Sequence, residues 1–378
     1  MRTTSKALIV VITLAAVGLI LLWFEFVGQR ERNLSGAVTP PLEAGAMDQA
    51  FAVLATGLEI PWSLDIMPDG GILLTERPGR VRLVDPRQGL TDEAVLEIEE
   101  VRHIGEGGLL GLALHPDFAD NRLVYLYYTY DHGSGVANKV VAYTLANRSM
   151  AKAETIIAGI PGARTHNGGR IKFGPDGLLY IATGDAAVPE LAQDRDSLAG
   201  KILRLRDDGA IPADNPFADS PVYSYGHRNP QGLAWDGDGN LWSTEHGPVA
   251  RDEINLIEPG HNYGWPVIRG DEKAPGLESP VLHSGRDTWA PSGADILDDS
   301  MYFAGLRGRA LYRFNLDRRN PALTPYLEGD FGRLRDVVAG PGGLLYVLTS
   351  NRDGRGVAAG DDDLVLVVNP VAVDEKSR

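Results

Sequence analysis

The residue best suited to proton transfer is His166, in the segment Arg-Thr-His-Asn-Gly-Gly-Arg that starts at Arg164. A histidine among small and polar neighbours, directly before an apolar run, is expected on an accessible loop. There its imidazole could act as a general base near neutral pH. A histidine that only caps its own loop is the alternative interpretation, which the spacing alone favours.

A second group of residues offers hydrogen-bond donors to an anion. Arg228 and Asn229 lie in Tyr-Gly-His-Arg-Asn-Pro-Gln-Gly, and Arg333 and Arg335 alternate in Gly-Arg-Leu-Arg-Asp. Arginine suits carboxylates because its planar guanidinium can hold them with two parallel hydrogen bonds. Ordinary surface ion pairs are the alternative, and would be preferred for either segment alone.

Oxygen ligands for a hard cation are concentrated between residues 245 and 257. Gly247 and Pro248 offer backbone carbonyls, and Asp252 and Glu253 offer carboxylates. Calcium prefers such ligands. The spacing is not that of an EF-hand loop, and acidic loop residues that simply face water are the alternative.

Several other chemistries are excluded by the sequence. The run Gly-Glu-Gly-Gly-Leu-Leu-Gly from Gly105 lacks the Lys-Ser/Thr of a phosphate loop and is expected to lead into strands. No His-Glu-x-x-His or Gly-x-Ser-x-Gly segment occurs, and the absence of cysteine rules out thiolates and disulfides. A net charge of −15 without a visible basic face argues against nucleic acid as a partner.

The elements that must position these residues are predicted by a repeated pattern. A turn rich in Asp and Gly is followed by a short strand of apolar and aromatic residues, as in Met-Pro-Asp-Gly-Gly-Ile-Leu-Leu-Thr-Glu. Asp caps its own turn, and Gly supplies the positive φ of a tight hairpin. The six copies are centred near Asp69, Asp117, Asp176, Asp238, Asp299 and Gly342.

This spacing of roughly 40 to 60 residues is that of a propeller blade. We therefore predict an all-β fold, a six-bladed β-propeller of four-stranded antiparallel blades. The run from Leu364 is expected to complete a blade begun by the strand at Phe51, and residues 190–198 are the best candidate for a helix outside the N-terminus. A pair of β-sandwiches or an irregular all-β fold is the alternative.

The N-terminus predicts a membrane anchor. Residues 7–24 are almost wholly apolar, long enough to cross a bilayer, and end in aromatic residues and not in a small-x-small cleavage site. We expect an uncleaved signal anchor and transmembrane helix (residues 1–27), a linker (28–50), the propeller (51–372) and a tail (373–378). The propeller would then be periplasmic, held at the inner membrane; a cleaved signal peptide is the alternative.

Taken together, the segments resemble the soluble pyrroloquinoline quinone (PQQ) glucose dehydrogenases and aldose sugar dehydrogenases, also called glucose/sorbosone dehydrogenases. The resemblance runs from about Gly57 to Pro370. Its strings, in the family's order, are GEGGLLGLALHPDF, HNGGRIKFGPDG, GKILRL, GHRNPQGLAW, EHGP, DEINLI and NYGWP. It implies the same six-bladed propeller.

The resemblance also implies roles for particular residues. His166 corresponds to the catalytic base, and Gly247 and Pro248 to residues whose carbonyls hold calcium under PQQ. Glu253 and Tyr263 correspond to ligands of a second calcium. The cofactor-binding positions are Glu106, Arg228, Asn229, Arg307, Arg333 and Arg335.

The implied reaction is the oxidation of an aldose at its anomeric carbon to an aldonolactone. His166 would take the hydroxyl proton while hydride passes to the quinone, whose growing charge calcium and Arg228 would stabilise. The electrons would then pass to an unidentified acceptor, a quinone or a cytochrome.

Three positions depart from the glucose dehydrogenase pattern. Thr165 stands where that enzyme has an aspartate beside the base, so we expect a weaker or differently oriented base. Glu106 replaces a glutamine, and its carboxylate would oppose an anionic cofactor unless it is protonated or turned toward arginine or calcium. Arg307 replaces a lysine.

Two functions from other classes compete with this interpretation. A calcium-dependent propeller lactonase, a hydrolase, would need a carboxylate-rich calcium site and would have no use for the arginines. A non-catalytic propeller that binds sugar or protein would reduce no dye with any cofactor.

Overall fold

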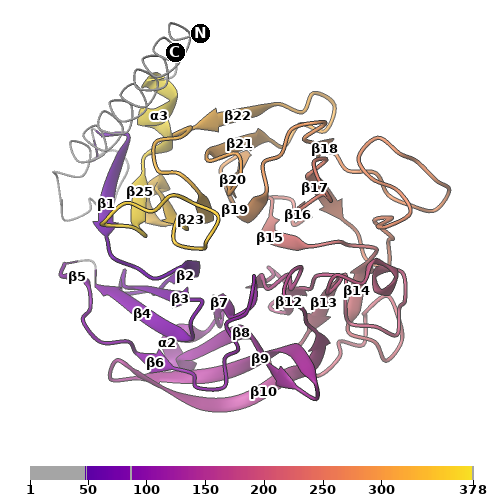
Figure 1. Cartoon of the computed structure of the whole chain (residues 1–378), viewed down its shortest axis with the longest axis horizontal. Coiled ribbons are helices and arrows are strands. Elements are labelled where there is room, and N and C mark those ends of the chain that lie inside the picture. Colours follow the sequence, from indigo (N-terminus) through magenta and orange to yellow (C-terminus); the bar gives the residue numbers. More distant parts are fainter. Residues whose placement is uncertain (1–46, 48, 86, 377–378) are drawn as a thin grey trace, which may run out of the picture. The chain divides into compact units, whose positions relative to one another are not determined.

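The computed structural model describes residue 47 and residues 49–85 and 87–376. These residues form six antiparallel sheets that follow one another around a ring (Figure 1). Strands of neighbouring blades contact each other in succession, and the last blade returns to the first. The predicted six-bladed propeller is therefore confirmed, with four strands in each blade and one additional short strand in the first.

Five blades consist of consecutive strands, ordered from the centre outward. The first holds β2 (Pro61–Ile66), β3 (Ile72–Glu76), β4 (Arg80–Asp85) and β5 (Gly89–Leu90), with β6 (Leu96–Glu97) also paired to β4. The second holds β7 (Leu109–Leu114), β8 (Leu123–His132), β9 (Gly135–Ala146) and β10 (Ser149–Pro161). The third holds β11 (Ile171–Phe173), β12 (Leu179–Ala182), β13 (Lys201–Leu205) and β14 (Val222–Tyr225). The fourth holds β15 (Pro230–Trp235), β16 (Leu241–Glu245), β17 (Glu253–Ile257) and β18 (Leu282–His283). The fifth holds β19 (Pro291–Leu297), β20 (Ser300–Gly305), β21 (Leu311–Asn315) and β22 (Leu323–Tyr326).

The sixth blade closes the ring with strands from both ends of the propeller. It holds β23 (Leu334–Ala339), β24 (Leu345–Thr349), β25 (Val365–Val368) and, outermost, β1 (Phe51–Ala55). Phe51 pairs with Val368 in antiparallel register. The predicted completion of one blade by the two chain ends is thus confirmed, and it leaves the ring without an open seam.

The Asp-Gly turns join the first and second strands of the blades, as the repeat predicted. Asp69 Oδ1 accepts the N–H of Gly71 at 3.0 Å, and Asp176 Oδ1 accepts the N–H of Leu178 at 3.1 Å. Gly70 has φ of +86°, a conformation that favours glycine. Because strands alternate in direction, these turns share one end of the ring. The links between second and third strands, and between blades, share the other end, which we call the site end.

The apolar core lies between adjacent blades. One cluster joins the second and third blades through residues such as Tyr127 and Ile181, and another joins the sixth and first through Leu64 and Val365. Burying each such side chain contributes roughly 1.5–3 kcal/mol. Packing between every pair of neighbours makes the ring a rigid support for the loops at its site end.

Helices are few and short among the described residues: α2 (Phe118–Asn121), α3 (Pro370–Lys376) and the 3-10 turns η2 (Pro189–Ala192) and η3 (Pro341–Gly343). The predicted helix over residues 190–198 is wrong beyond η2. The buried Lys201 ammonium takes the carbonyls of Leu191, Ala192 and Ala199 at 2.8, 3.1 and 2.6 Å. The loop folds around this ammonium group, and its carbonyls are used there and not along a helix.

No helix within residues 49–85 and 87–376 is long and apolar enough to cross a membrane. The predicted anchor (residues 1–27) and nearly all of the predicted linker (28–50) lie outside the described residues. Met47 belongs to the core between the sixth and first blades, and its carbonyl accepts a hydrogen bond from Asn369 Nδ2 at 2.9 Å.

Candidate active site

The predicted base, His166, lies in the loop between the second and third blades, at the site end. Its backbone has φ of +58°, and its N–H donates to Glu106 Oε2 at 3.0 Å. The loop after β12 packs directly against it: a Cβ on Gly184 would lie 1.9 Å from the His166 carbonyl oxygen. Only glycine permits that approach, and it brings the next residue, Asp185, to the imidazole.

Asp185 is the partner of the predicted base. Its Oδ1 lies 2.8 Å from His166 Nδ1, and the carboxylate has no exposed surface while the imidazole is 20% exposed. Oδ1 also accepts the N–H of Ala187 at 2.8 Å, and Oδ2 accepts Trp265 Nε1–H at 2.9 Å. The base therefore has a carboxylate partner from another loop, which the threonine at position 165 could not supply.

Arg228 faces the other imidazole nitrogen. Its Nη2 lies 2.9 Å from His166 Nε2. Arginine has donors only, so Nε2 is an acceptor, Nδ1 carries the ring proton, and that proton is donated to Asp185. The lone pair needed by a general base is thus on Nε2, where it accepts the Arg228 N–H in this structure.

Glu106 connects Arg355 to the loop that carries His166. Its Oε1 pairs with Arg355 Nη1 at 2.7 Å, and its Oε2 holds the backbone of His166. Burial alone would raise the pKa of Glu106, but the His166 N–H and the charge of Arg355 outweigh it and hold that pKa below its ordinary value. The carboxylate is therefore ionised and turned toward arginine, one of the two conditions under which glutamate is tolerable here.

Arg333 and Arg335 converge on a carboxylate that the sequence did not reveal. Asp353 Oδ2 accepts Arg333 Nη2 at 2.7 Å and lies 3.8 Å from Arg335 Nη2. Arg335 also donates to Gln231 Oε1 at 3.0 Å. Burial lowers the pKa of Arg335 to about 9. Both predicted arginines are thus buried at one place, and neither belongs to an ordinary surface ion pair.

A small cavity lies between these groups, lined by Trp62, Arg77, Glu106, Gln231, Arg335 and Asp353 among others. We call it the central cavity. Arg77, absent from the sequence predictions, donates from Nη2 to the carbonyls of Gly105 and Gly107. Three arginine N–H groups and one imidazole nitrogen in and beside this cavity are buried and have no hydrogen-bond partner among the described residues: Arg77 Nε, Arg228 Nε, Arg335 Nε and His246 Nε2.

Two predicted cofactor-binding residues behave differently. Asn229 is almost wholly buried, and its Oδ1 accepts the N–H of Gly168 at 3.0 Å, which fixes the His166 loop. Arg307 is exposed, and its guanidinium makes no hydrogen bond or ion pair with the described residues. Asn229 therefore contacts the His166 loop through the backbone of Gly168, whereas the Arg307 side chain is exposed and hydrogen-bonds to none of the predicted site residues.

The loop with the predicted calcium carbonyls stands beside Arg228. The Gly247 carbonyl accepts Arg228 Nη1 at 2.8 Å, so it points toward the arginine that contacts the base. Asp252 is no free ligand: Oδ1 accepts the N–H of Gly247 at 2.9 Å, and Oδ2 accepts the N–H groups of Trp289 and Ala290. It holds the loop in place. No hydrogen bond reaches the Pro248 carbonyl from the described residues.

Glu253 and Tyr263 lie in one connected group behind this loop. Burial, followed by the charge of Glu245, raises the pKa of Glu253 to about 7. Glu245 faces Glu253 across β16 and β17, and it binds His227 Nδ1 at 2.9 Å. The His227 ring stacks on Tyr263 with centroids 4.8 Å apart. Two neighbouring buried carboxylates are an environment that favours a cation.

Ser224, His227 and Glu245 have the connectivity of a hydrolase triad, since Ser224 Oγ lies 2.8 Å from His227 Nε2. Ser224 and His227 have no exposed surface, so no ester could reach the hydroxyl. Among the described residues, no three histidine, aspartate or glutamate side chains are placed to hold a metal ion. The carboxylate-rich calcium site required by a lactonase is therefore not found in this part of the chain.

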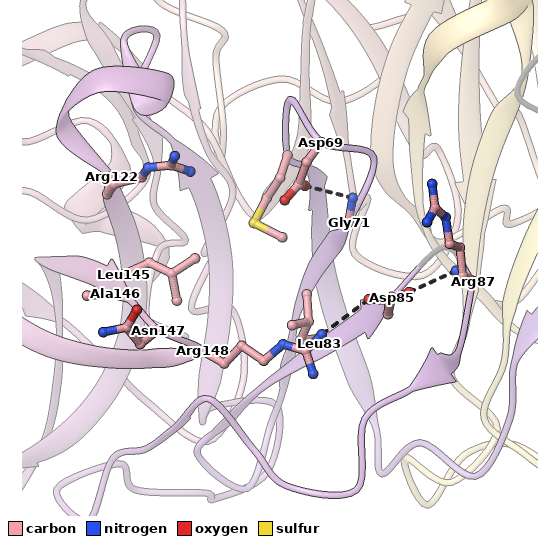
Figure 2. A pocket seen from close by; sticks show the side chains of 11 residues that line it. Asp69, Gly71, Leu83, Asp85, Arg87, Arg122, Leu145, Ala146, Asn147 and Arg148 are labelled. Atoms are coloured by element: carbon pink, nitrogen blue, oxygen red, sulfur yellow. Dashed lines mark hydrogen bonds and ion pairs between the residues drawn. The ribbon is translucent and has the colours of Figure 1, made fainter.

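A larger groove lies away from this chemistry. It has a volume of about 650 Å³ and lies beside the Asp69 turn, between the first two blades. Figure 2 shows Arg148 directed at Asp85, 3.3 Å apart, and Arg122 across the groove. It holds none of the predicted site residues.

The protein is thus a six-bladed propeller. At one end it carries a histidine–aspartate pair and a cluster of buried arginines. The sequence matches the glucose/sorbosone dehydrogenases over residues 58–364, and the chain belongs to that family.

Relatives of known name agree with this. Aldose sugar dehydrogenase YliI of Escherichia coli is 35% identical over 80% of this chain and 90% of its own length. Quinoprotein glucose dehydrogenase B of Acinetobacter calcoaceticus is 35% identical over 62% of this chain and 56% of its own. The PQQ-bound aldose sugar dehydrogenase of Streptomyces coelicolor is 42% identical with a TM-score of 0.79, covering 83% of this chain and 95% of that one.

Proposed function

We propose that this protein oxidises aldose sugars at the anomeric carbon to aldonolactones, with PQQ as the bound oxidant. The observation that carries the proposal is the arrangement around His166. Nδ1 is fixed by a fully buried carboxylate, and Nε2 carries the lone pair, which accepts the Arg228 N–H. Such a pair suits removal of a proton from a sugar hydroxyl.

The arginine cluster suits an anionic, planar cofactor. Three buried arginine N–H groups in and beside the central cavity have no partner among the described residues, and an unpartnered buried donor is costly. Burial also lowers the pKa of Arg77, Arg228 and Arg335, so an added negative charge would be favourable there. These residues would hold the carboxylates of PQQ, which when bound supplies the acceptor for the hydride.

Each residue then has a physical task. Once the sugar hydroxyl has replaced the Arg228 N–H at Nε2, His166 accepts the hydroxyl proton there, and Asp185 stabilises the imidazolium that results. Arg228 stands between that nitrogen and the Gly247 carbonyl and can stabilise negative charge close to the base. Asp353 and Glu106 keep Arg333 and Arg355 in place, because each carboxylate holds a guanidinium by direct contact.

Calcium would bind at two places. The carbonyls of Gly247 and Pro248 can supply two ligands beside the cofactor, and the remaining oxygen ligands would come from PQQ and water. Glu253, with Tyr263 nearby, would hold the second ion, which would neutralise a buried carboxylate of raised pKa.

We further propose that the propeller lies in the periplasm, anchored to the inner membrane by the apolar N-terminal run, and passes electrons to a quinone or a cytochrome. The support is the length of that run and its aromatic end. Protease treatment of spheroplasts tests this: the propeller should be digested from outside while the protein stays with the membrane.

The first experiment uses the full chain in mild detergent, purified without cofactor. PQQ, calcium and a panel of aldoses are added, and reduction of an artificial dye is followed. Reduction that requires all three additions supports the proposal. No reduction, with no PQQ retained after desalting, would overturn it.

The base is tested in the same assay. His166→Ala should lower kcat by at least ~100-fold, the usual scale of general-base catalysis, while PQQ stays bound. His132→Ala, at an exposed hairpin of the second blade, is the matched control and should leave kcat unchanged. Near-normal turnover of the His166 variant would remove this residue from the mechanism.

A further inference from the structure

We propose that Trp265 is a positioning residue for the catalytic pair, acting through its indole N–H on Asp185. The inference rests on the proposed function for its kinetic part. Its spectroscopic part concerns the chain without any cofactor.

The geometry makes Trp265 the third member of a hydrogen-bonded series. Its Nε1–H donates to Asp185 Oδ2 at 2.9 Å, and Asp185 Oδ1 lies 2.8 Å from His166 Nδ1. Oδ1 has a second donor, the N–H of Ala187. Among the described residues Oδ2 has Trp265 alone. The indole therefore decides where the second oxygen points, and so how the carboxylate is rotated toward the imidazole.

Trp265 is itself firmly held. Its backbone N–H donates to the Gly226 carbonyl at 2.9 Å, and its backbone carbonyl accepts a hydrogen bond from Gln193 Nε2 at 2.6 Å. The guanidinium carbons of Arg228 and Arg269 lie 5.3 and 5.6 Å from its ring centroid. With two arginines over its ring, this tryptophan is poorly suited to stack on a sugar and well suited to fix a carboxylate.

The charged groups that face His166 all come from separate loops. Asp185 follows β12, Arg228 follows β14, and Glu106 precedes β7 and reaches the His166 backbone. Trp265, from the loop after β17, touches two of these groups at once, Asp185 by its N–H and Arg228 by its ring. Its side chain links the orienting carboxylate to the arginine at the opposite imidazole nitrogen.

The test is Trp265→Phe, which keeps an aromatic ring for the arginines and removes the N–H. We expect kcat to fall at least about tenfold, the scale seen when the support of an active-site group is lost. KM for the sugar should stay within about twofold, since no sugar contact is removed. A rise in KM with unchanged kcat would overturn the proposal, because it would make Trp265 a substrate contact.

The second readout needs neither PQQ nor sugar. In the cofactor-free protein, the His166 Nδ1 proton should give a protected NMR signal, assigned by its loss in His166→Gln. In Trp265→Phe that signal should broaden by exchange, and in Asp185→Asn the Trp265 indole signal should shift. An unchanged Nδ1 proton in a folded Trp265→Phe protein would overturn the proposal even if the chain oxidised no sugar.

A double variant separates positioning from general damage. Trp265→Phe added to Asp185→Asn should lower kcat by less than about twofold more, because the indole acts through the carboxylate already lost. Full multiplication of the two effects would show that Trp265 acts by another route.

Discussion

The substitution Asp185→Asn tests the site most severely, because three donors aim at this one carboxylate. His166 Nδ1–H and the Ala187 N–H reach Oδ1, and Trp265 Nε1–H reaches Oδ2. An asparagine has only one oxygen, and its amide group carries two donors of its own. In either orientation, a donor of the amide therefore faces a donor of the protein at a side chain that has no exposed surface.

Both outcomes for the imidazole are unfavourable. If the amide donates to Nδ1, the ring proton moves to Nε2, where it meets Arg228 Nη2 at 2.9 Å, donor against donor. If the amide oxygen faces Nδ1 instead, the ring proton stays in place, but the imidazolium formed during the reaction has no negative charge beside it. Loss of a correctly oriented base costs about 10²- to 10⁴-fold in rate. An unsatisfied buried polar group costs about 1–3 kcal/mol of stability.

The assay is steady-state dye reduction with PQQ, calcium and an aldose, accompanied by urea unfolding of the same preparations. We expect kcat to fall at least ~100-fold, on the scale of general-base catalysis, with PQQ still bound. Asp196→Asn, an exposed carboxylate in the same loop, is the control and should change neither quantity. A kcat within about threefold of wild type would refute the role of Asp185 and the assignment of the ring proton that leads to it.

Three further predictions concern the cavity and the ring. Arg333→Ala should weaken PQQ binding by about 1.5–3 kcal/mol, measured by titration, whereas the fully exposed Arg319→Ala should not; equal affinities would make Arg333 a purely structural residue. Glu106→Gln keeps an acceptor for His166 and breaks only the pair with the largely exposed Arg355, so the free energy of unfolding should change by less than about 1 kcal/mol; a larger loss would show that the pair with Arg355 is more than a weak surface contact. Burial raises the pKa of Asp65 to about 6 in the folded protein, above its value near 4 in the unfolded chain. Its contribution to the free energy of unfolding is therefore fully present below about pH 4 and is lost as the pH rises through 6. Asp65→Asn should therefore cost more at pH 4 than at pH 7.5, by up to about 3 kcal/mol, and the opposite trend would refute this.

The fold was predictable because its signals are local. An Asp-Gly turn such as that at Asp69 is specified by a few adjacent residues, and six of them at blade spacing imply a ring. The closing strand was predictable too, since Phe51 and Val368 begin and end the set of strand-like runs. The helix expected after Glu190 failed because Lys201, farther along the chain, takes the carbonyls on which that helix would depend.

The site was predictable only in part, because its partners are distant in sequence. The resemblance gave His166 and the arginines, but not the carboxylates that hold them. Asp185 stands 19 positions from His166, and Asp353 stands 20 from Arg333. A signal for Asp185 existed: Gly184 before it, directly after a strand, marks a close approach of backbones. Nothing comparable precedes Asp353, whose role depends on the loop that brings it back to the cavity.

The buried arginines explain why an acidic chain can hold an anionic cofactor. Three arginines and two carboxylates line the central cavity within a protein of net charge −15. Burying such groups costs free energy that ion pairing only partly returns. Burial lowers the pKa of Arg335 to about 9, and the Nε atoms of Arg77 and Arg335 have no partner among the described residues, as expected where ion pairing offsets the cost only in part. A site for a polycarboxylate requires buried cations that added negative charge would stabilise. The arginines that the loops bring together meet this requirement, which links the arrangement of the loops to the proposed cofactor.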